Sequence, residues 1–509
     1  MKQLIPRRPI SCLCGFVAIL GIAFDAARIH AAEAARPNIV FILADDLGYR
    51  EVGSFGQQKI RTPNIDALAA QGMKLTQHYC GNAVCAPSRC VLMTGLHPGH
   101  AHVRSNSEMQ PEGQKPIPDS TVTLAERLKA QGYATGAFGK WGLGGPGSEG
   151  EPLRQGFDRF FGYNCQRHAH SYYPDYLWSD NERIPLQNSP PVPGHAKLAA
   201  GADVTDPHSY DIFKGQEYAP QRIREEALKF IDQHKAEPFF LYYPSVLPHV
   251  ALHVPDAELQ QYSELKWNDP PFTAAKGGYT PHFTPRAAYA AMISHLDSEV
   301  GAIMKRLKEQ GLEENTLVIF SSDNGTTHLD QEVDYDFFES VGELRGLKGS
   351  LYEGGVRVPT IVRWPGHIAA GSNNDYVSGF EDWTPTILDA TGAASEIPAT
   401  IDGVDLLPML TGKPQPSRAF LYREFPSYGG QQTIRMGDWK AVRQDMARGN
   451  IDVELYNIAT DIGEKHNVAE QHPDVVAKLT KMMAEQHQPS ELFPLRPFDQ
   501  PALKNQKKK

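Results

Sequence analysis

The chain has 509 residues, of which 41% are hydrophobic and 22% charged, and its formal net charge at pH 7 is -10. This length exceeds what one small hydrophobic core serves, so we expect a globular protein with one large and one smaller domain. The negative net charge argues against a nucleic-acid-binding protein, because such proteins need a basic face.

The first 35 residues have the layout of a secretory signal peptide. Lys2, Arg7 and Arg8 precede the apolar run CLCGFVAILGIAF, and the small residues of HAAEAA offer a cleavage site. The alternative is a membrane anchor, but the run is shorter than the roughly 20 residues of a membrane span. We therefore expect an exported protein, periplasmic or secreted, with no stable membrane insertion after cleavage, and we exclude residues 1–35 from the fold.

From Arg36 onwards, apolar strands alternate with amphipathic helices. NIVFILA is a nearly continuous apolar run, which is typical of a strand buried on both faces. TLAERLKAQG is predicted to be a helix with Thr123 and Glu126 as its capping box, and the strand-like YATGAF follows. A long helix from about Arg286 to Gln310 leads into the strand NTLVIFSS. This order predicts an α/β fold with a large, mixed and mostly parallel sheet flanked by helices.

Two stretches have a different texture. Residues 146–220 are rich in Tyr, His, Pro and Gly with little periodicity, so we expect an irregular segment of functional importance. From about residue 415, the short strands AFLYRE, QTIRMGD, WKAVRQD and VELYNI precede the helix PDVVAKLTKMMAEQ. We therefore predict a large α/β domain over residues 36–414 and a smaller α+β domain over 415–509 with a solvated polar tail.

Four cysteines remain after the signal peptide, namely Cys80, Cys85, Cys90 and Cys165. They are too few for a disulfide framework in so long a chain, and their spacing does not match the close pairs of zinc sites. A bridge between Cys80 and Cys90 stays open. Cys85 begins CAPSRCVLMTG at a predicted helix start, where the helix dipole and Arg89 favour a thiolate. The alternative for Cys85 is a buried structural thiol.

Polar side chains follow several of the predicted strands, at the sheet edge where ligands gather in α/β proteins. Asp45 and Asp46 come directly after NIVFILA, and Asp323 and Asn324 come directly after LVIFSS. These four residues offer only oxygen atoms, which indicates a hard divalent cation, with Ca²⁺ as the first choice and Mg²⁺ as the second. The alternative is that each pair only caps a turn or a following helix.

Basic residues accompany these oxygen ligands. Lys140 follows YATGAF, Lys348 lies in LRGLKGSLYEGGVRVP, and together with Arg89 they suit a compact anion such as a sulfate ester or a phosphate. His249, just beyond the strand in PFFLYYPSVLP, could protonate a departing alcohol. Taken singly, each could equally be a surface charge or a structural histidine.

The segment CAPSR, which starts at Cys85, resembles the C-x-P-S-R signature of type I sulfatases in the alkaline phosphatase superfamily. Six further segments match that family in order: NIVFILADDLGY, GKWGLG, PHVALHVP, SSDNG, LKGSLYEGGVRVP and VELYNIATDIGEKHNVA. The resemblance runs from about residue 36 to about residue 485. It implies an alkaline phosphatase-like fold and a sulfatase that hydrolyses a sulfate monoester.

In that family a maturation enzyme oxidises the cysteine to formylglycine during export, and the hydrated aldehyde is the nucleophile. An unmodified serine or thiol would lack the second hydroxyl that releases sulfate. The resemblance assigns calcium to five residues, namely Asp45, Asp46, Asp323, Asn324 and the modified Cys85. It further implies that Arg89 steadies the hydrate, Lys140 and Lys348 hold sulfate oxygens, and His249 assists the leaving alcohol.

One position departs from the family pattern. The family has a histidine two residues after the lysine of the GKW motif, and this chain has Gly142. The segment FGYNCQRHAHSYYP falls where sulfatases often place a sulfate-contacting side chain, and it supplies Gln166, His168 and His170. We expect a replacement for the missing histidine to be His168 or His170, because imidazole titrates near neutral pH.

The expected substrate is a sulfated sugar rather than a small aryl sulfate, because Tyr172, Tyr173 and Trp178 suit the faces of sugar rings. Two alternatives stay open: a phosphodiester or phosphonate ester hydrolase of the same superfamily, and a catalytically silent protein that binds sulfated glycans, suggested by Gly142. A Cys–His hydrolase with an unmodified thiol would leave the acidic residues unexplained.

Overall fold

The computed structural model describes Met1 and residues 36–499. The predicted signal peptide and the KKK end therefore lie outside the described residues, apart from Met1. Within the described part of the chain, no helix has the length and apolar character needed to cross a membrane.

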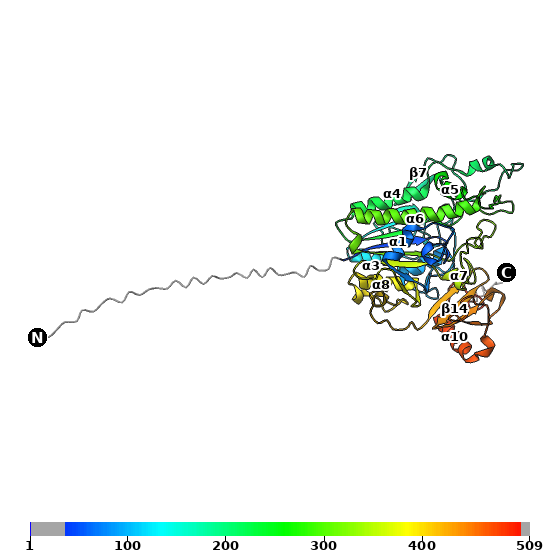
Figure 1. Ribbon diagram of the computed structural model, residues 1–509. Helices are drawn as coiled ribbons and strands as arrows, with labels where there is room; N and C mark the ends of the chain where they lie inside the picture. The colour runs from blue at the N-terminus through cyan, green and yellow to red at the C-terminus, as the bar shows by residue number, and fades with distance from the viewer. Residues whose placement is uncertain (2–35, 500–509) are drawn as a thin grey trace, which may run out of the picture. The chain divides into compact units, whose positions relative to one another are not determined.

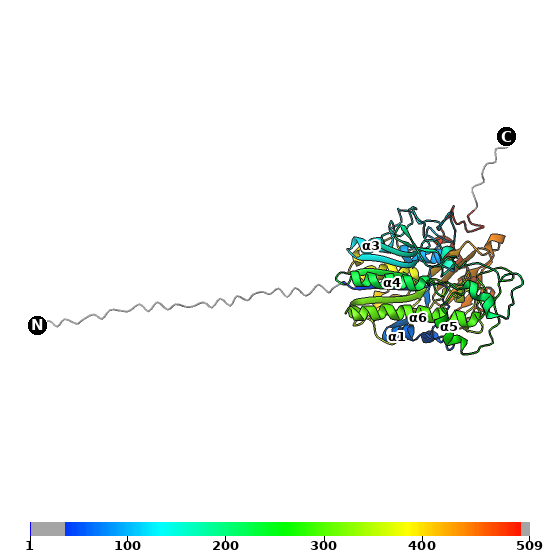
Figure 2. The same cartoon turned by 90° about the horizontal axis from the view of Figure 1, so that it is seen from above.

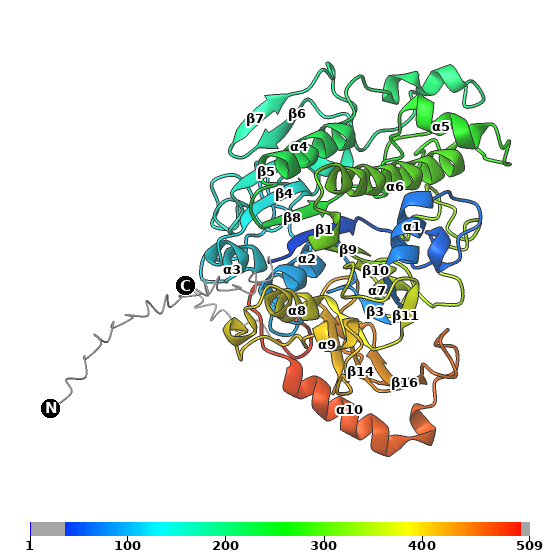
Figure 3. The ribbon, with the colours of Figure 1, turned by 60° about the vertical axis from the view of Figure 1, so that its left-hand side comes forward.

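A ten-stranded sheet runs through the centre of the described residues (Figure 3). Its strands, in spatial order, are β11 (Ser372–Asn374), β2 (Met73–Leu75), β10 (Thr360–Arg363), β9 (Thr316–Ser322), β1 (Asn38–Ala44), β8 (Phe239–Pro244), β4 (Ala134–Lys140), β5 (Arg159–Tyr163), β6 (Tyr176–Ser179) and β7 (Glu182–Pro185). The strands from β9 to β5 are parallel, whereas β10, β6 and β7 run antiparallel to their neighbours. The predicted mixed, mostly parallel sheet is confirmed.

Helices cover both faces of this sheet, and β1 is accordingly buried at every position and apolar from Ile39 to Ala44. One face of β1, with Val40 and Ile42, packs on α1 (Pro63–Gln71), α4 (Ala219–Gln233) and α6 (Pro285–Glu309), and α4 and α6 lie side by side (Figures 1 and 2). The other face, with Ile39 and Phe41, packs on α2 (Cys85–Thr94), α3 (Leu124–Ala130) and α8 (Trp383–Ala390). Side chains that alternate along one strand therefore build two separate hydrophobic cores.

A second, antiparallel sheet lies near the C-terminal end of the described residues (Figure 1). Its strands are β13 (Leu421–Phe425), β14 (Gln431–Met436), β15 (Trp439–Arg443) and β16 (Glu454–Asn457), and α10 (Pro473–Gln486) packs on it. The predicted small sheet with its closing helix is confirmed, whereas the boundary between residues 414 and 415 stays a prediction. The remaining short elements are β3 (His78–Tyr79), β12 (Ser378–Gly379), α5 (Asp256–Ser263), α7 (Glu353–Val356) and α9 (Leu407–Leu410).

Several local predictions can be compared with the structure. Thr123 and Glu126 form the expected capping box of α3, in which each side chain accepts a hydrogen bond from the backbone of the other. The interpretation of residues 146–220 as irregular is wrong in part, because this stretch contains β5, β6 and β7. These strands have only four or five residues each, too few for a clear period in the sequence.

The four cysteines of the described residues are buried and free. The bridge between Cys80 and Cys90 that the sequence left open is therefore not formed. Disulfides thus play no part in holding this core together.

Candidate active site

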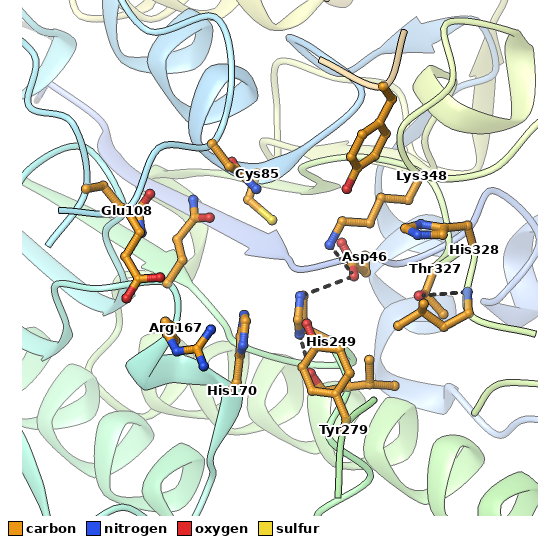
Figure 4. A pocket seen from close by; sticks show the side chains of 16 residues that line it. Asp46, Cys85, Glu108, Arg167, His170, His249, Tyr279, Thr327, His328 and Lys348 are labelled. Carbon is orange, nitrogen blue, oxygen red and sulfur yellow. Dashed lines mark hydrogen bonds and ion pairs between the residues drawn. The ribbon is translucent and has the colours of Figure 1, made fainter. Parts of the chain in front are cut away.

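The candidate site lies where the central strands end. Asp45 and Asp46 follow β1, Asp323 follows β9, Lys140 is the last residue of β4, and Cys85 opens α2. These side chains come from segments far apart in the chain and meet because parallel strands bring their carboxyl ends to one edge. A cavity of about 430 Å³ opens beside them, lined by Asp46, Cys85, His249, Lys348 and twelve further residues (Figure 4).

Three carboxylates in the site are each paired with a cation. Lys140 Nζ lies 2.6 Å from Asp45 Oδ2 and Lys348 Nζ lies 2.8 Å from Asp46 Oδ2. The Arg89 guanidinium lies 2.8 Å from Asp323 Oδ2 and 3.4 Å from Asp45 Oδ2, and it also donates to the backbone oxygen of Lys140. The predicted acidic and basic residues therefore meet in one buried cluster.

The carboxyl groups respond differently to this environment. Burial by itself raises the pKa of Asp45, but the positive charge of Lys140 and of its neighbours outweighs burial and holds the pKa well below its usual range. Burial, and next the charge of Asp45, raise the pKa of Asp323 to about 7. The pKa values of Asp45 and Asp323 are therefore shifted in opposite directions, although each carboxylate is paired with a cation.

Cys85 lines the cavity, and its thiol is not activated as a thiolate. Its Sγ is 3.4 Å from Asp45 Oδ1 and 3.7 Å from Lys140 Nζ. Burial, and next the charge of Asp45, raise the pKa of the thiol well above its usual range. The expectation of a thiolate favoured by Arg89 is therefore wrong, because Arg89 is bound to Asp323. An unmodified Cys85 is poorly suited to nucleophilic attack.

The oxygen atoms of the cluster fit a hard divalent cation. Ligand atoms of Asp45, Asp46, Cys85 and His249 all lie within 4.8 Å of one another. Asn324 Nδ2 donates to Asp46 Oδ1 at 2.7 Å, but Asn324 Oδ1 is buried without a partner, as a missing ligand would leave it. Carboxylate and amide oxygens are what Ca²⁺ and Mg²⁺ prefer.

Asp323 stands slightly apart from that group. Its Oδ1 accepts a hydrogen bond from the backbone N–H of Asp46 at 3.1 Å, and its Oδ2 is engaged by Arg89. The residues predicted to bind a cation from both strand ends therefore lie together, with Asp323 at the edge of the group, and the cation itself stays a prediction.

Two histidines form one side of the cavity (Figure 4). His249 Nε2 lies 3.6 Å from Asp46 Oδ2, and its Nδ1–H donates to the backbone oxygen of Val250. The ring of His170 stacks on His249 with centroids 5.0 Å apart, and its Nδ1 lies 2.9 Å from His195 Nε2. Burial, and next the charge of Lys348, lower the pKa of His249 well below its usual range, so the ring is neutral.

Gln166 occupies the space beside Gly142, where the family pattern has a histidine. A Cβ built on Gly142 would lie 2.9 Å from Gln166 Nε2, and Gly142 has a φ of +81°. The Gln166 amide nitrogen is buried without a partner, and the residue lines the cavity together with His170. His168 does not line the cavity, because its ring packs against Tyr163 and Tyr176.

The prediction that three aromatic residues contact a sugar is wrong. Tyr172, Tyr173 and Trp178 are buried in the two hydrophobic cores and do not line the cavity. Sequence reasoning missed other residues that line the cavity, among them Asn106, Glu108, Arg167, Tyr279, His328 and Tyr428. No spacing or motif could have found them, since they come from five separate loops.

Comparison with known proteins shows that this chain is similar to sulfatases. The model of the sulfatase family matches residues 37–393, and the model of the C-terminal region of N-sulphoglucosamine sulphohydrolase matches residues 347–489. Arylsulfatase A of Bos taurus is 35% identical over 422 residues, which are 81% of this chain and 75% of the relative. An N-acetylgalactosamine-6-O-sulfatase of Bacteroides thetaiotaomicron is 29% identical over 556 aligned positions, and the match covers 95% of this chain and 98% of the relative.

A solved structure of Ps i-CgsB in complex with k-i-k-neocarrahexaose has a similar fold. The two structures superpose with a TM-score of 0.72 and 26% sequence identity, and the match covers 89% of this chain and 94% of the Ps i-CgsB chain. The family match spans all four central strands whose ends form the cavity, β1, β4, β8 and β9, as well as Cys85 and Lys348. This chain therefore belongs to the sulfatase family.

Proposed function

We propose that this sulfatase removes sulfate from a sugar ring of an oligosaccharide or polysaccharide, with Cys85 converted to formylglycine and with a bound divalent cation, Ca²⁺ in first place. The observation that carries the proposal is the buried meeting of three carboxylates and three basic side chains around Cys85 at one cavity. The sugar sulfatase among its relatives, and the carbohydrate bound by a structure of similar fold, support a saccharide substrate.

The cation would be held by oxygen atoms of Asp45, Asp46 and Asn324, with Asp323 at the edge and the modified Cys85 as a further ligand. The unpartnered Oδ1 of Asn324 supports this assignment. Hydrated formylglycine supplies an oxygen nucleophile for the sulfur atom, and the cation supplies positive charge beside it. Each turnover consumes one water and yields the free alcohol and inorganic sulfate.

The basic side chains would bind the sulfate group. Lys140 and Lys348 each contact one carboxylate, and a cation that shares those carboxylates leaves ammonium hydrogens free for sulfate oxygens. Arg89 is fixed by Asp323 and by the backbone of Lys140, so its guanidinium stays in place beside residue 85. Such fixed charges lower the free energy of the transition state because they need no reorganisation.

His249, Gln166 and His170 would act on the other side of the sulfate. His249 Nε2 lies 3.6 Å from Asp46 Oδ2 at the cavity, and it would protonate the leaving alcohol oxygen only in the charged form of the ring, because the neutral ring carries its hydrogen on Nδ1. Gln166 can donate its free amide hydrogens to a sulfate oxygen but cannot exchange a proton. Of the two histidines considered for the work of the missing family histidine, only His170 lines the cavity, so we assign it that place.

Export and maturation belong to the same proposal. The signal-like N-terminus supports delivery to the periplasm or the exterior, and a formylglycine-generating enzyme is the required partner for Cys85. Neither a nucleic acid nor the membrane is expected as a partner.

The test is the chemical state of Cys85 together with sulfate release. The protein is produced with a formylglycine-generating enzyme, and mass spectrometry of the Cys85 peptide gives the converted fraction. Sulfate is then quantified by ion chromatography with 4-nitrophenyl sulfate, N-acetylgalactosamine 6-sulfate and sulfated neocarrahexaose, with Ca²⁺ or a chelator. Matched phosphate and phosphonate esters are the control for the alternative hydrolase. A fully converted protein that releases no sulfate would reject the proposal.

A further inference from the structure

An aromatic side chain from the C-terminal sheet reaches the rim of the catalytic cavity. Tyr428 lies in the turn between β13 and β14, and it lines the cavity together with Cys85 and Lys348. Tyr428 is 59% exposed, so much of its surface is accessible to a ligand. The sequence offered no functional reason for a tyrosine at this turn.

The backbone holds this tyrosine in a rare conformation. Tyr428 has a φ of +49°, in the left-handed region that residues other than glycine seldom adopt. The turn is anchored on both sides, since Gly430 N–H donates to Ser427 O at 3.1 Å and Met446 N–H donates to Gly430 O at 3.0 Å. Strain of this kind persists where the surroundings fix it, and it gathers at ligand sites.

The ring rests directly on the loop that carries Lys348. A Cβ built on Gly349 would lie 2.3 Å from Tyr428 Cδ2, so the ring fits only because residue 349 has no side chain. The rings of Phe425 and His328 meet it edge-on, with centroids 5.4 and 5.9 Å away. These supports fix the position of the ring beside the cavity, while more than half of its surface faces solvent.

We infer that Tyr428 is a stacking platform for the sugar unit next to the sulfated one, so that the enzyme recognises at least two units of a sulfated glycan. This inference rests on the proposed sulfatase function and names its substrate more closely. An exposed, immobile aromatic face binds the apolar face of a pyranose at little entropic cost. Polar groups of the same cavity, among them Asn106, Glu108 and Arg167, are available to the hydroxyls of that unit.

The proposal predicts a loss confined to long substrates. Tyr428→Asn removes the ring but tolerates the left-handed backbone, so the turn keeps its conformation. We expect kcat/KM for sulfated neocarrahexaose or a chondroitin 6-sulfate hexasaccharide, divided by kcat/KM for 4-nitrophenyl sulfate, to fall about tenfold. Tyr428→Phe keeps the ring face and is the matched control, with a ratio near that of the parent enzyme.

Each outcome decides the matter. An equal loss for the aryl and glycan substrates in Tyr428→Asn would overturn the inference, because it reports damage to the sulfate site. A parent enzyme that favours 4-nitrophenyl sulfate or a sulfated monosaccharide over every hexasaccharide would also overturn it, while the sulfatase proposal stands. Absence of sulfate release from all substrates, with Cys85 fully converted, would instead reject the proposed function.

Discussion

The amide of Gln166 gives the sharpest quantitative prediction for the sulfate site. Its Nε2 is buried without a partner at the cavity that holds Cys85. A hydrogen bond to a charged group is worth about 1.5–3 kcal/mol. Loss of that bond in Gln166→Ala should therefore lower kcat/KM for 4-nitrophenyl sulfate by about 10- to 150-fold. Gln166→Glu should lower it further, because its carboxylate repels the anionic substrate.

A substitution at Gly142 tests the position of the Gln166 amide, because Gly142 lies beside it. In Gly142→Ala the new methyl group lies 2.9 Å from Gln166 Nε2, and the φ of +81° disfavours any residue with a Cβ. We expect lower activity and a lower thermal midpoint, and the double variant Gly142→Ala/Gln166→Ala should regain part of the stability without regaining activity. The reasoning is refuted if folded Gln166→Ala keeps kcat/KM within about twofold of the parent enzyme.

Three further predictions concern chemistry, metal binding and stability. Cys85→Ala cannot form the aldehyde, so multiple turnover should vanish while the thermal midpoint stays; sustained sulfate release would contradict this. Asp323→Asn should weaken Ca²⁺ binding measured by calorimetry, and an unchanged affinity would remove Asp323 from the site. Lys440 lies 2.9 Å from both Glu353 and Glu464, all buried, so Lys440→Met should lower the free energy of unfolding in urea by about 3–5 kcal/mol. Burial raises the pKa of Glu464 to about 7, so this carboxyl takes up a proton as the pH falls and the loss should shrink from about pH 8 to about pH 5. A loss that is constant across this range would contradict the assignment.

The central sheet could be predicted from the sequence because its signals are local. The six consecutive apolar residues of β1, Ile39 to Ala44, are all buried, and alternate side chains belong to two different cores, as an unbroken apolar run implies. The helix expected over 286–310 occupies Pro285–Glu309. The strands β6 and β7 at one end of the sheet were missed, because pairing with a neighbour rather than their own composition makes them strands.

The sequence could predict which residues form the site, but not how burial and neighbouring charges shift their pKa values. The strand-end rule brought Asp45 and Asp323 to one edge from positions far apart in the chain. The state of Cys85 could not be predicted, because it depends on burial and on the distance to Asp45 rather than on neighbours in sequence. The same holds for Tyr172, since composition cannot distinguish an aromatic residue facing a ligand from one in the core.

The C-terminal sheet contributes to the site only through tertiary contacts between segments far apart in the sequence. Gln431, the first residue of β14, is buried although it is polar, and its side-chain amide makes two hydrogen bonds to the loop that carries Lys348. Its Nε2 donates to Gly349 O at 2.7 Å and its Oε1 accepts from Leu351 N at 2.9 Å. A strand pattern predicts which side chains share a face, but it cannot say which loop will satisfy a buried amide. The small sheet therefore supports the loop of Lys348, which is proposed to bind sulfate, and Tyr428 on the adjoining turn lines the same cavity.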